Sequence, residues 1–268
     1  MTGKGGVGKT MFCHALGTAH AERGARPVVV ELLPRTDNAQ PLQVEPQSAG
    51  YGVLRLHADA ALGAYLEHFV RVRRVAQTVL RNATLQRFFR AAPGVEEVAI
   101  YQTLERLMDD DYDPVIVDLD ATGHAQMFLE LPKVLDEVLG PGPMRRLIDS
   151  FSQTLADDAV TALHVVTVPE PVVVEETEEL LSALAPKRPL PLGALVINRI
   201  HESPLRLADR ALLSELSAWD RALAERELDR LELQSAERMR LESLAVEPLC
   251  LAESDPAALF ARLRGALQ

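Results

Sequence analysis

The chain opens with the stretch GKGGVGKT at residues 3–10, which has the spacing G-x-x-x-x-G-K-T. In a loop of this kind successive backbone N–H groups surround a row of phosphates, and glycines permit an approach that side chains would block. We expect Lys9 to reach the β- and γ-phosphates and the Thr10 hydroxyl to bind Mg²⁺. A helix starting near Thr10 would point its positive N-terminus at the same anion. The predicted nucleotide contacts are Gly3, Lys4, Gly5, Gly6, Val7, Gly8, Lys9, Thr10 and Met11.

A second lysine, Lys4, follows the first glycine, where a generic phosphate-binding loop has no fixed requirement. The stretch resembles the deviant Walker A loop of the superfamily that includes ParA, MinD, the nitrogenase iron protein and ArsA. In that superfamily this lysine crosses a dimer interface to the partner's nucleotide. The resemblance implies ATP, catalytic roles for Lys4 and Lys9, and a dimer closed across two nucleotides. The alternative is a solvated loop lysine, with Lys9 sufficient for binding.

A second motif follows the apolar run at residues 114–117. Asp118 ends this predicted strand, where a carboxylate can hold Mg²⁺ through water. The stretches DLDATGH at 118–124 and FLELP at 128–132 resemble the switch of ArsA-type ATPases, including the arsenite-pump ATPase and the guided-entry ATPase for tail-anchored proteins. The resemblance implies a segment that senses the γ-phosphate, with His124 as a switch residue.

Alternation of apolar runs with helical stretches predicts an α/β fold with a mostly parallel sheet flanked by helices. We expect a helix at 11–23, strands at 28–30, 114–118, 163–168 and 193–198, and one or two long surface helices within 203–244. Trp219 is expected to pack against the sheet layer. The prediction is a single P-loop ATPase domain over residues 1–268, with helical insertions at about 51–92 and 127–160.

The strand that normally leads into a P-loop has almost no sequence here, since only Met1 and Thr2 precede Gly3. Its absence would leave ladder groups of the neighbouring strands unpaired. We therefore expect a first strand that is missing or truncated, through a start site placed too far downstream or a shortened chain.

Two later segments resemble the adenine pocket of the family. The run VINR at 196–199 resembles the strand whose Asn reads the base, and an amide such as that of Asn198 can both donate to and accept from adenine. The run EPL at 247–249 resembles the exit of the last strand, which implies that Pro248 lines the other side of the base. The run PE at 169–170 and the later ET at 176–177 resemble a strand-to-helix passage of the family.

The first switch departs from the family pattern. Members commonly place an Asp before Pro to orient the attacking water, and the aligned stretch ELLPRTD at 31–37 has Leu33 there. Leucine can neither accept a proton nor position water, so we expect slow hydrolysis, with Asp120 or Glu31 as the substitute. Asp37 is a further candidate. Such a version also resembles a bacterial branch of paired ArsA-like ATPases.

Composition limits the partners. The net charge of −11 over 268 residues argues against nucleic-acid binding, because phosphates require a cationic face. Two cysteines give no metal-ligand spacing, and no apolar run of membrane-spanning length occurs, so a cytoplasmic protein is expected. Residues 71–90 contain six arginines and no acid. They predict either an ordinary surface helix or a transient membrane-surface or partner contact.

Three functions remain open from the sequence. The first is an ArsA-like dimeric switch that couples ATP binding and hydrolysis to a client or partner, with helices of 51–90 and 127–160 forming the client surface. The second is a nucleotide-binding subunit that forms a heterodimer with a hydrolysing paralogue. The third is a ParA- or MinD-type positioning ATPase, which the acidic balance disfavours.

Overall fold

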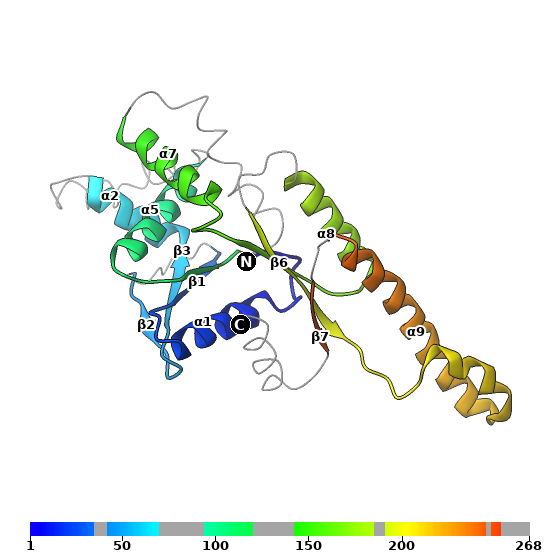
Figure 1. The fold of residues 1–268 in the computed structure, drawn as a ribbon. Helices are drawn as coiled ribbons and strands as arrows, with labels where there is room; N and C mark the ends of the chain where they lie inside the picture. The colour runs from blue at the N-terminus through cyan, green and yellow to red at the C-terminus, as the bar shows by residue number, and fades with distance from the viewer. Residues whose placement is uncertain (35–41, 70–93, 120–141, 185–190, 245–247, 253–268) are drawn as a thin grey trace. The chain divides into compact units, whose positions relative to one another are not determined.

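The computed structural model describes residues 1–34, 42–69, 94–119, 142–184, 191–244 and 248–252, and Figure 1 shows their helices and strands. They belong to two compact units. The first unit comprises Met1–Thr2, Lys9–Ala162 and Arg188–Pro191, and the second comprises Gly3–Gly8, Leu163–Lys187 and Leu192–Gln268.

The first unit is built on a sheet in the order β2-β3-β1-β4. β1 pairs in parallel with both β3 and β4, and only the short β2 runs antiparallel, to β3. The strands are β1 (Val28–Leu33), β2 (Glu45–Pro46), β3 (Gly52–His57) and β4 (Val115–Asp118), and the helices are α1 (Lys9–Glu22), α2 (Ala58–Phe69), α5 (Val95–Asp109) and α7 (Pro143–Ala156). The run of β-branched residues 28–30 is fully buried, as expected of a central parallel strand.

Helices cover the sheet of the first unit. α1 packs against β1 and β4, while α5 packs against both α2 and α7. Tyr101 of α5 stacks on Phe151 of α7 with ring centroids 4.0 Å apart, and both side chains are buried. The aromatic pair adds to the apolar area that holds these helices together.

The second unit contains a parallel sheet in the order β5-β6-β7. Its elements are β5 (Leu163–Thr167), α8 (Pro171–Leu184), β6 (Leu192–Ile200), the 3₁₀ helix η1 (Leu207–Glu215), α9 (Ala218–Glu242) and β7 (Leu249–Ala252). Val174 of α8, Ile197 and Ile200 of β6, and Leu241 near the end of α9 form one buried cluster.

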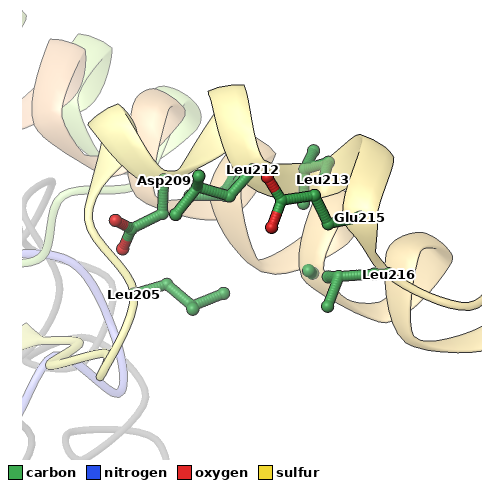
Figure 2. Close-up of a pocket in the computed structure, with 8 residues that line it drawn as sticks. Leu205, Asp209, Leu212, Leu213, Glu215 and Leu216 are labelled. Atoms are coloured by element: carbon green, nitrogen blue, oxygen red, sulfur yellow. The ribbon is translucent and has the colours of Figure 1, made fainter.

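The other end of α9 packs against η1. Between them lies a pocket of about 310 Å³, and Figure 2 shows how the η1 side chains line it. The lining residues are Leu205, Asp209, Leu212, Leu213, Glu215, Leu216, Ala224 and Leu228. Of the one or two long helices predicted within 203–244, α9 is present with 25 residues, and the shorter 3₁₀ helix η1 precedes it.

The predicted α/β class and mostly parallel pairing are confirmed, and three expectations are corrected. The described strands form two sheets, one in each unit, where a single sheet was expected. Residues 52–57, assigned to a helical insertion, form β3 instead, because buried Val53, Leu54 and Leu56 complete the sheet beside β1. Trp219 does not pack on a sheet: it lies in the first turn of α9 and is 80% exposed.

Met1 lies beside β4 and makes two hydrogen bonds to its backbone. Its amino group donates to the Val117 carbonyl at 2.8 Å, and the Leu119 N–H donates to the Met1 carbonyl at 3.0 Å. These two bonds, on either side of Asp118, are those that a parallel neighbour makes. Met1 therefore satisfies ladder groups of β4 that were expected to be unpaired.

Candidate nucleotide-binding site

The phosphate loop begins in the second unit, where Gly3 lies against β5. Its φ is +143°, and a Cβ there would lie 2.0 Å from the Val166 carbonyl oxygen, so any side chain would clash with backbone. A Cβ on Gly5 or Gly6 would meet nothing within 4 Å. The loop thus has one face pressed on β5 and open space at its middle, where its backbone can receive a ligand.

Asn198 fixes the same loop from β6. Its side-chain amide donates a 2.8 Å hydrogen bond to the Val7 carbonyl, and both residues are buried. The register between β6 and β7 shifts between Ile197 and Ile200, and Arg199 has a positive φ of 53°. Bulges of this kind redirect side chains next to binding sites. The observed contact of Asn198 is therefore with the phosphate loop, and its role at the adenine base remains a prediction.

Lys4 points to an acidic residue of its own chain. Its Nζ lies 2.7 Å from Glu176 Oε1 of α8, with both side chains about one-third exposed. The following residue, Thr177, is buried, donates to the Val173 carbonyl at 2.7 Å and lies 2.8 Å from the Thr167 hydroxyl. Of the Glu-Thr pair at 176–177, Glu176 thus forms an ion pair with Lys4, and Thr177 packs between α8 and β5.

In the first unit, α1 starts at Lys9, which is 8% exposed, and continues with Thr10. The Thr10 hydroxyl donates to Asp118 Oδ2 at 2.5 Å. Asp118 is 9% exposed, and its Oδ1 is buried with no hydrogen-bond partner among the described residues. A buried carboxylate oxygen without a donor is costly unless a cation or water satisfies it. Thr10 and Asp118, which the sequence analysis both assigned to magnesium binding, therefore lie in direct contact.

Burial also shifts the pKa of two groups of the first unit, the Met1 amino group and the Cys13 thiol of α1. It lowers the pKa of the Met1 amino group, with the nearby Cys13 and Asp118 opposing the shift. It raises the pKa of the Cys13 thiol to about 12, so this cysteine is a protonated core residue at neutral pH. No catalytic use of the Cys13 thiol follows from its surroundings.

Glu31, a candidate for hydrolysis, is engaged on both oxygens. Oε1 lies 2.9 Å from His14 Nε2 of α1, and Oε2 lies 3.3 Å from Arg55 Nε of β3. The other ring nitrogen of His14 lies 3.0 Å from the Tyr51 hydroxyl, and Arg55 also pairs with Glu45 at 2.7 Å. The sequence reasoning missed His14, Tyr51, Arg55 and Glu45, since only the spacing of His14 four residues after Thr10 hinted at a shared helix face.

The other predicted site residues that the structure describes are Leu33, Met11 and Pro248. Leu33 is the last residue of β1 and is half-buried, and Met11 is half-buried on α1. Pro248 immediately precedes β7, and its contact with a base remains a prediction. Asp37, Asp120, His124, the basic stretch 71–90 and the part of the second insertion before residue 142 lie outside the described residues, and the rest of that insertion contains α7.

The family of anion-transporting ATPases has a sequence profile that matches residues 1–148, which is more than half of the chain. The chain belongs to this family, the ArsA-type ATPases. The resemblance inferred from the loop and the switch is thereby confirmed, and nucleotide binding follows from the family.

Three relatives extend the comparison. The ATPase BagA of Mycobacterium tuberculosis is 29% identical over 233 residues, which cover 79% of this chain and 68% of BagA. An ATPase ASNA1 homolog of Entamoeba histolytica is 28% identical over 171 residues, or 58% of this chain and 51% of the relative. ATPase ASNA1 homolog 1 of Paramecium tetraurelia is 25% identical over 150 residues, or 51% and 44%. The BagA match extends beyond the part of the chain that the family profile covers.

The described residues fit a magnesium–nucleotide pair. Thr10 offers a hydroxyl and Asp118 an unsatisfied buried carboxylate oxygen, which is the oxygen chemistry that Mg²⁺ prefers. Among the helices that the structure describes, none is long and apolar enough to cross a bilayer.

Proposed function

We propose that this ArsA-type ATPase is a dimeric switch that binds ATP with Mg²⁺ and hydrolyses it slowly to control a partner-binding surface. The observation that carries the proposal is the contact between Thr10, which directly follows the phosphate loop, and the buried Asp118, whose Oδ1 has no hydrogen-bond partner among the described residues. It supports a metal at the start of α1, beside the buried Lys9. The cytoplasmic location expected from the sequence remains part of this proposal.

Each residue would contribute through binding and orientation. Loop N–H groups and Lys9 would hold the β- and γ-phosphates, and Thr10 and Asp118 would hold Mg²⁺, with Asp118 acting through water. When bound, Mg²⁺ would neutralise charge that develops on the phosphates. Asn198 would hold the Val7 end of the loop, because its amide is fixed on the Val7 carbonyl.

Dimer closure would use Lys4. Reaching a partner's nucleotide requires Lys4 to leave Glu176, its ion-pair partner at 2.7 Å. Exposed ion pairs contribute little free energy, on the order of 0–1 kcal/mol, so a phosphate from a partner can compete with Glu176. A closed dimer would then gate a client surface formed by parts of 51–90 and 127–160, and residues 71–90 would supply any transient membrane contact.

Slow hydrolysis follows from Leu33. A leucine at the end of β1 supplies no group to orient water, and both Glu31 oxygens already have partners. Asp120 and Glu31 stay the candidate substitutes. If Asp120→Asn and Glu31→Gln both left turnover unchanged, this assignment of the hydrolytic carboxylate would be wrong.

The test is phosphate release by the purified chain, with binding of a fluorescent ATP analogue measured in parallel. Analogue binding that requires Mg²⁺, together with slow release by the chain alone, supports the switch. Absence of analogue binding would overturn the proposal.

Leu33 also favours a second candidate, a nucleotide-binding subunit that hydrolyses nothing alone. In that case analogue binding would persist, and phosphate release would appear only after a paralogue encoded nearby is added. Mixing the two proteins therefore separates a homodimeric enzyme from one half of a heterodimer.

A further inference from the structure

One face of α1 contacts the sheet of the first unit at three positions along the helix. Thr10, His14 and Gly17 lie four and three residues apart, so they share a face of the helix. Thr10 contacts Asp118 on β4 at 2.5 Å, and His14 contacts Glu31 on β1 at 2.9 Å. At Gly17 a methyl group would lie 3.1 Å from the Val29 side chain, tighter than ordinary packing.

The strand residues that meet this face also form a lateral row. Glu31 is the register partner of Asp118 on one side and of Arg55 on the other. Side chains at paired positions of parallel strands project to the same face of a sheet. Asp118 and Glu31 therefore lie side by side on the face of the sheet that α1 covers. Thr10 in the first turn of α1 contacts Asp118, and His14 in the next turn contacts Glu31.

His14 and Glu31 each have a second polar partner besides one another. The second His14 nitrogen lies 3.0 Å from the Tyr51 hydroxyl, and the second Glu31 oxygen lies 3.3 Å from Arg55 Nε. Glu31 has a side chain only 15% exposed, and that of His14 is 25% exposed. A partly buried, multiply bonded pair resists rotation better than an exposed pair, because fewer alternative geometries satisfy all four groups.

We propose that His14 and Glu31 are positioning residues for the magnesium site: their contact fixes the height and rotation of α1 over the sheet and so holds Thr10 against Asp118. The inference rests on the proposed nucleotide–metal function. It gives Glu31 an indirect role, through α1, and gives a histidine outside the loop motif influence over metal binding.

The experiment measures binding of a fluorescent ATP analogue to the full chain as a function of Mg²⁺ concentration. His14→Ala and Glu31→Ala should each raise the half-saturating Mg²⁺ concentration, on the order of tenfold, as removal of outer partners of metal ligands does elsewhere. Binding without Mg²⁺ should change little, because the loop backbone holds the phosphates. The double variant should match either single variant, since both remove one contact.

Glu31→Gln provides the conservative rescue. Its amide can still bond His14, so half-saturation by Mg²⁺ should stay within about threefold of the wild type. His20→Ala, six residues further along the same helix, is the matched control. Melting temperatures of all variants separate loss of folding from loss of positioning.

Hydrogen exchange of the first turn of α1 in the nucleotide-free protein supplies an independent readout. Faster exchange in His14→Ala and Glu31→Ala, but not in His20→Ala, supports the inference. Unchanged Mg²⁺ dependence and unchanged exchange in a folded His14→Ala would overturn it. If the wild type binds no analogue, the proposed function fails, and the exchange result still decides whether His14 positions the helix.

Discussion

The Thr10 hydroxyl donates to Asp118 Oδ2 across 2.5 Å, while Asp118 Oδ1 is buried without a hydrogen-bond partner among the described residues. The relationship joins the first turn of α1 to the end of β4. It leaves one carboxylate oxygen available to a metal-bound water, which is why the magnesium proposal rests on this pair.

Asp118→Asn should weaken Mg²⁺-dependent binding of an ATP analogue by about ten- to a hundredfold, because the variant loses the charge that holds the metal. Titration of analogue fluorescence with and without Mg²⁺ measures the effect. Asp149→Asn on α7, whose native carboxylate pairs with Arg145, is the control and should bind as the wild type does. Equal binding by Asp118→Asn and the wild type would contradict a metal role for Asp118.

Glu176→Gln should favour dimerisation in the presence of ATP and Mg²⁺, because it frees Lys4 from an ion pair within the chain. The gain in dimer affinity should be at most about fivefold, because the Lys4–Glu176 ion pair is about one-third exposed and such pairs contribute little free energy. Light scattering coupled to size exclusion measures it, with Glu179→Gln on the exposed side of the same helix as control. Loss of the ATP-dependent dimer in Lys4→Ala is the companion result, and a dimer insensitive to both variants would refute the model of closure.

Thr177→Val should destabilise the protein by about 1–3 kcal/mol, because it leaves the buried Thr167 hydroxyl without its acceptor. Thr167→Val should cost less, since Thr177 still donates to the Val173 carbonyl. Denaturant unfolding of the two variants gives the comparison. The opposite order would show that the hydrogen-bond chain runs in the other direction.

Trp219→Ala should change the free energy of unfolding by less than about 0.5 kcal/mol, since the side chain is 80% exposed and removes little surface from water. Trp219 is the single tryptophan of the chain, so intrinsic fluorescence reports on it alone. Its emission should already lie near that of a solvated indole in the folded protein. A blue-shifted native emission would mean that the ring is covered.

Cys13 should resist thiol reagents at pH 8 in the folded protein. Burial raises its pKa from an ordinary 9.0 to about 12, which leaves about one thiolate in ten thousand. Because the folded pKa is the higher one, the associated stability is complete below pH 9 and is lost as the pH rises toward 12. Timed labelling before and after denaturation, with Cys13→Ala to assign the slow thiol, tests the first expectation. Unfolding measured between pH 8 and 11 tests the second.

Local patterns were enough to predict β1, β4, β5 and β6, and to single out Thr10 and Asp118, which the structure brings into contact. The β-branched run at 28–30 and the apolar run before Asp118 are short and continuous, which is typical of buried parallel strands. β3 escaped prediction because residues 52–57 owe their strand to hydrogen bonds with β1, a partner distant in sequence. Trp219 was misplaced because an aromatic residue predicts burial only on average.

The sequence by itself determined the phosphate loop, its two lysines and the family, because glycine spacing and residue chemistry are written locally along the chain. Only the tertiary structure decided the partners. It placed Lys4 on Glu176, Asn198 on the Val7 carbonyl, and Glu31 between His14 and Arg55. Such contacts depend on strand register and on the height of a helix over its sheet. Both are set by packing between segments far apart in the chain, which no local pattern encodes.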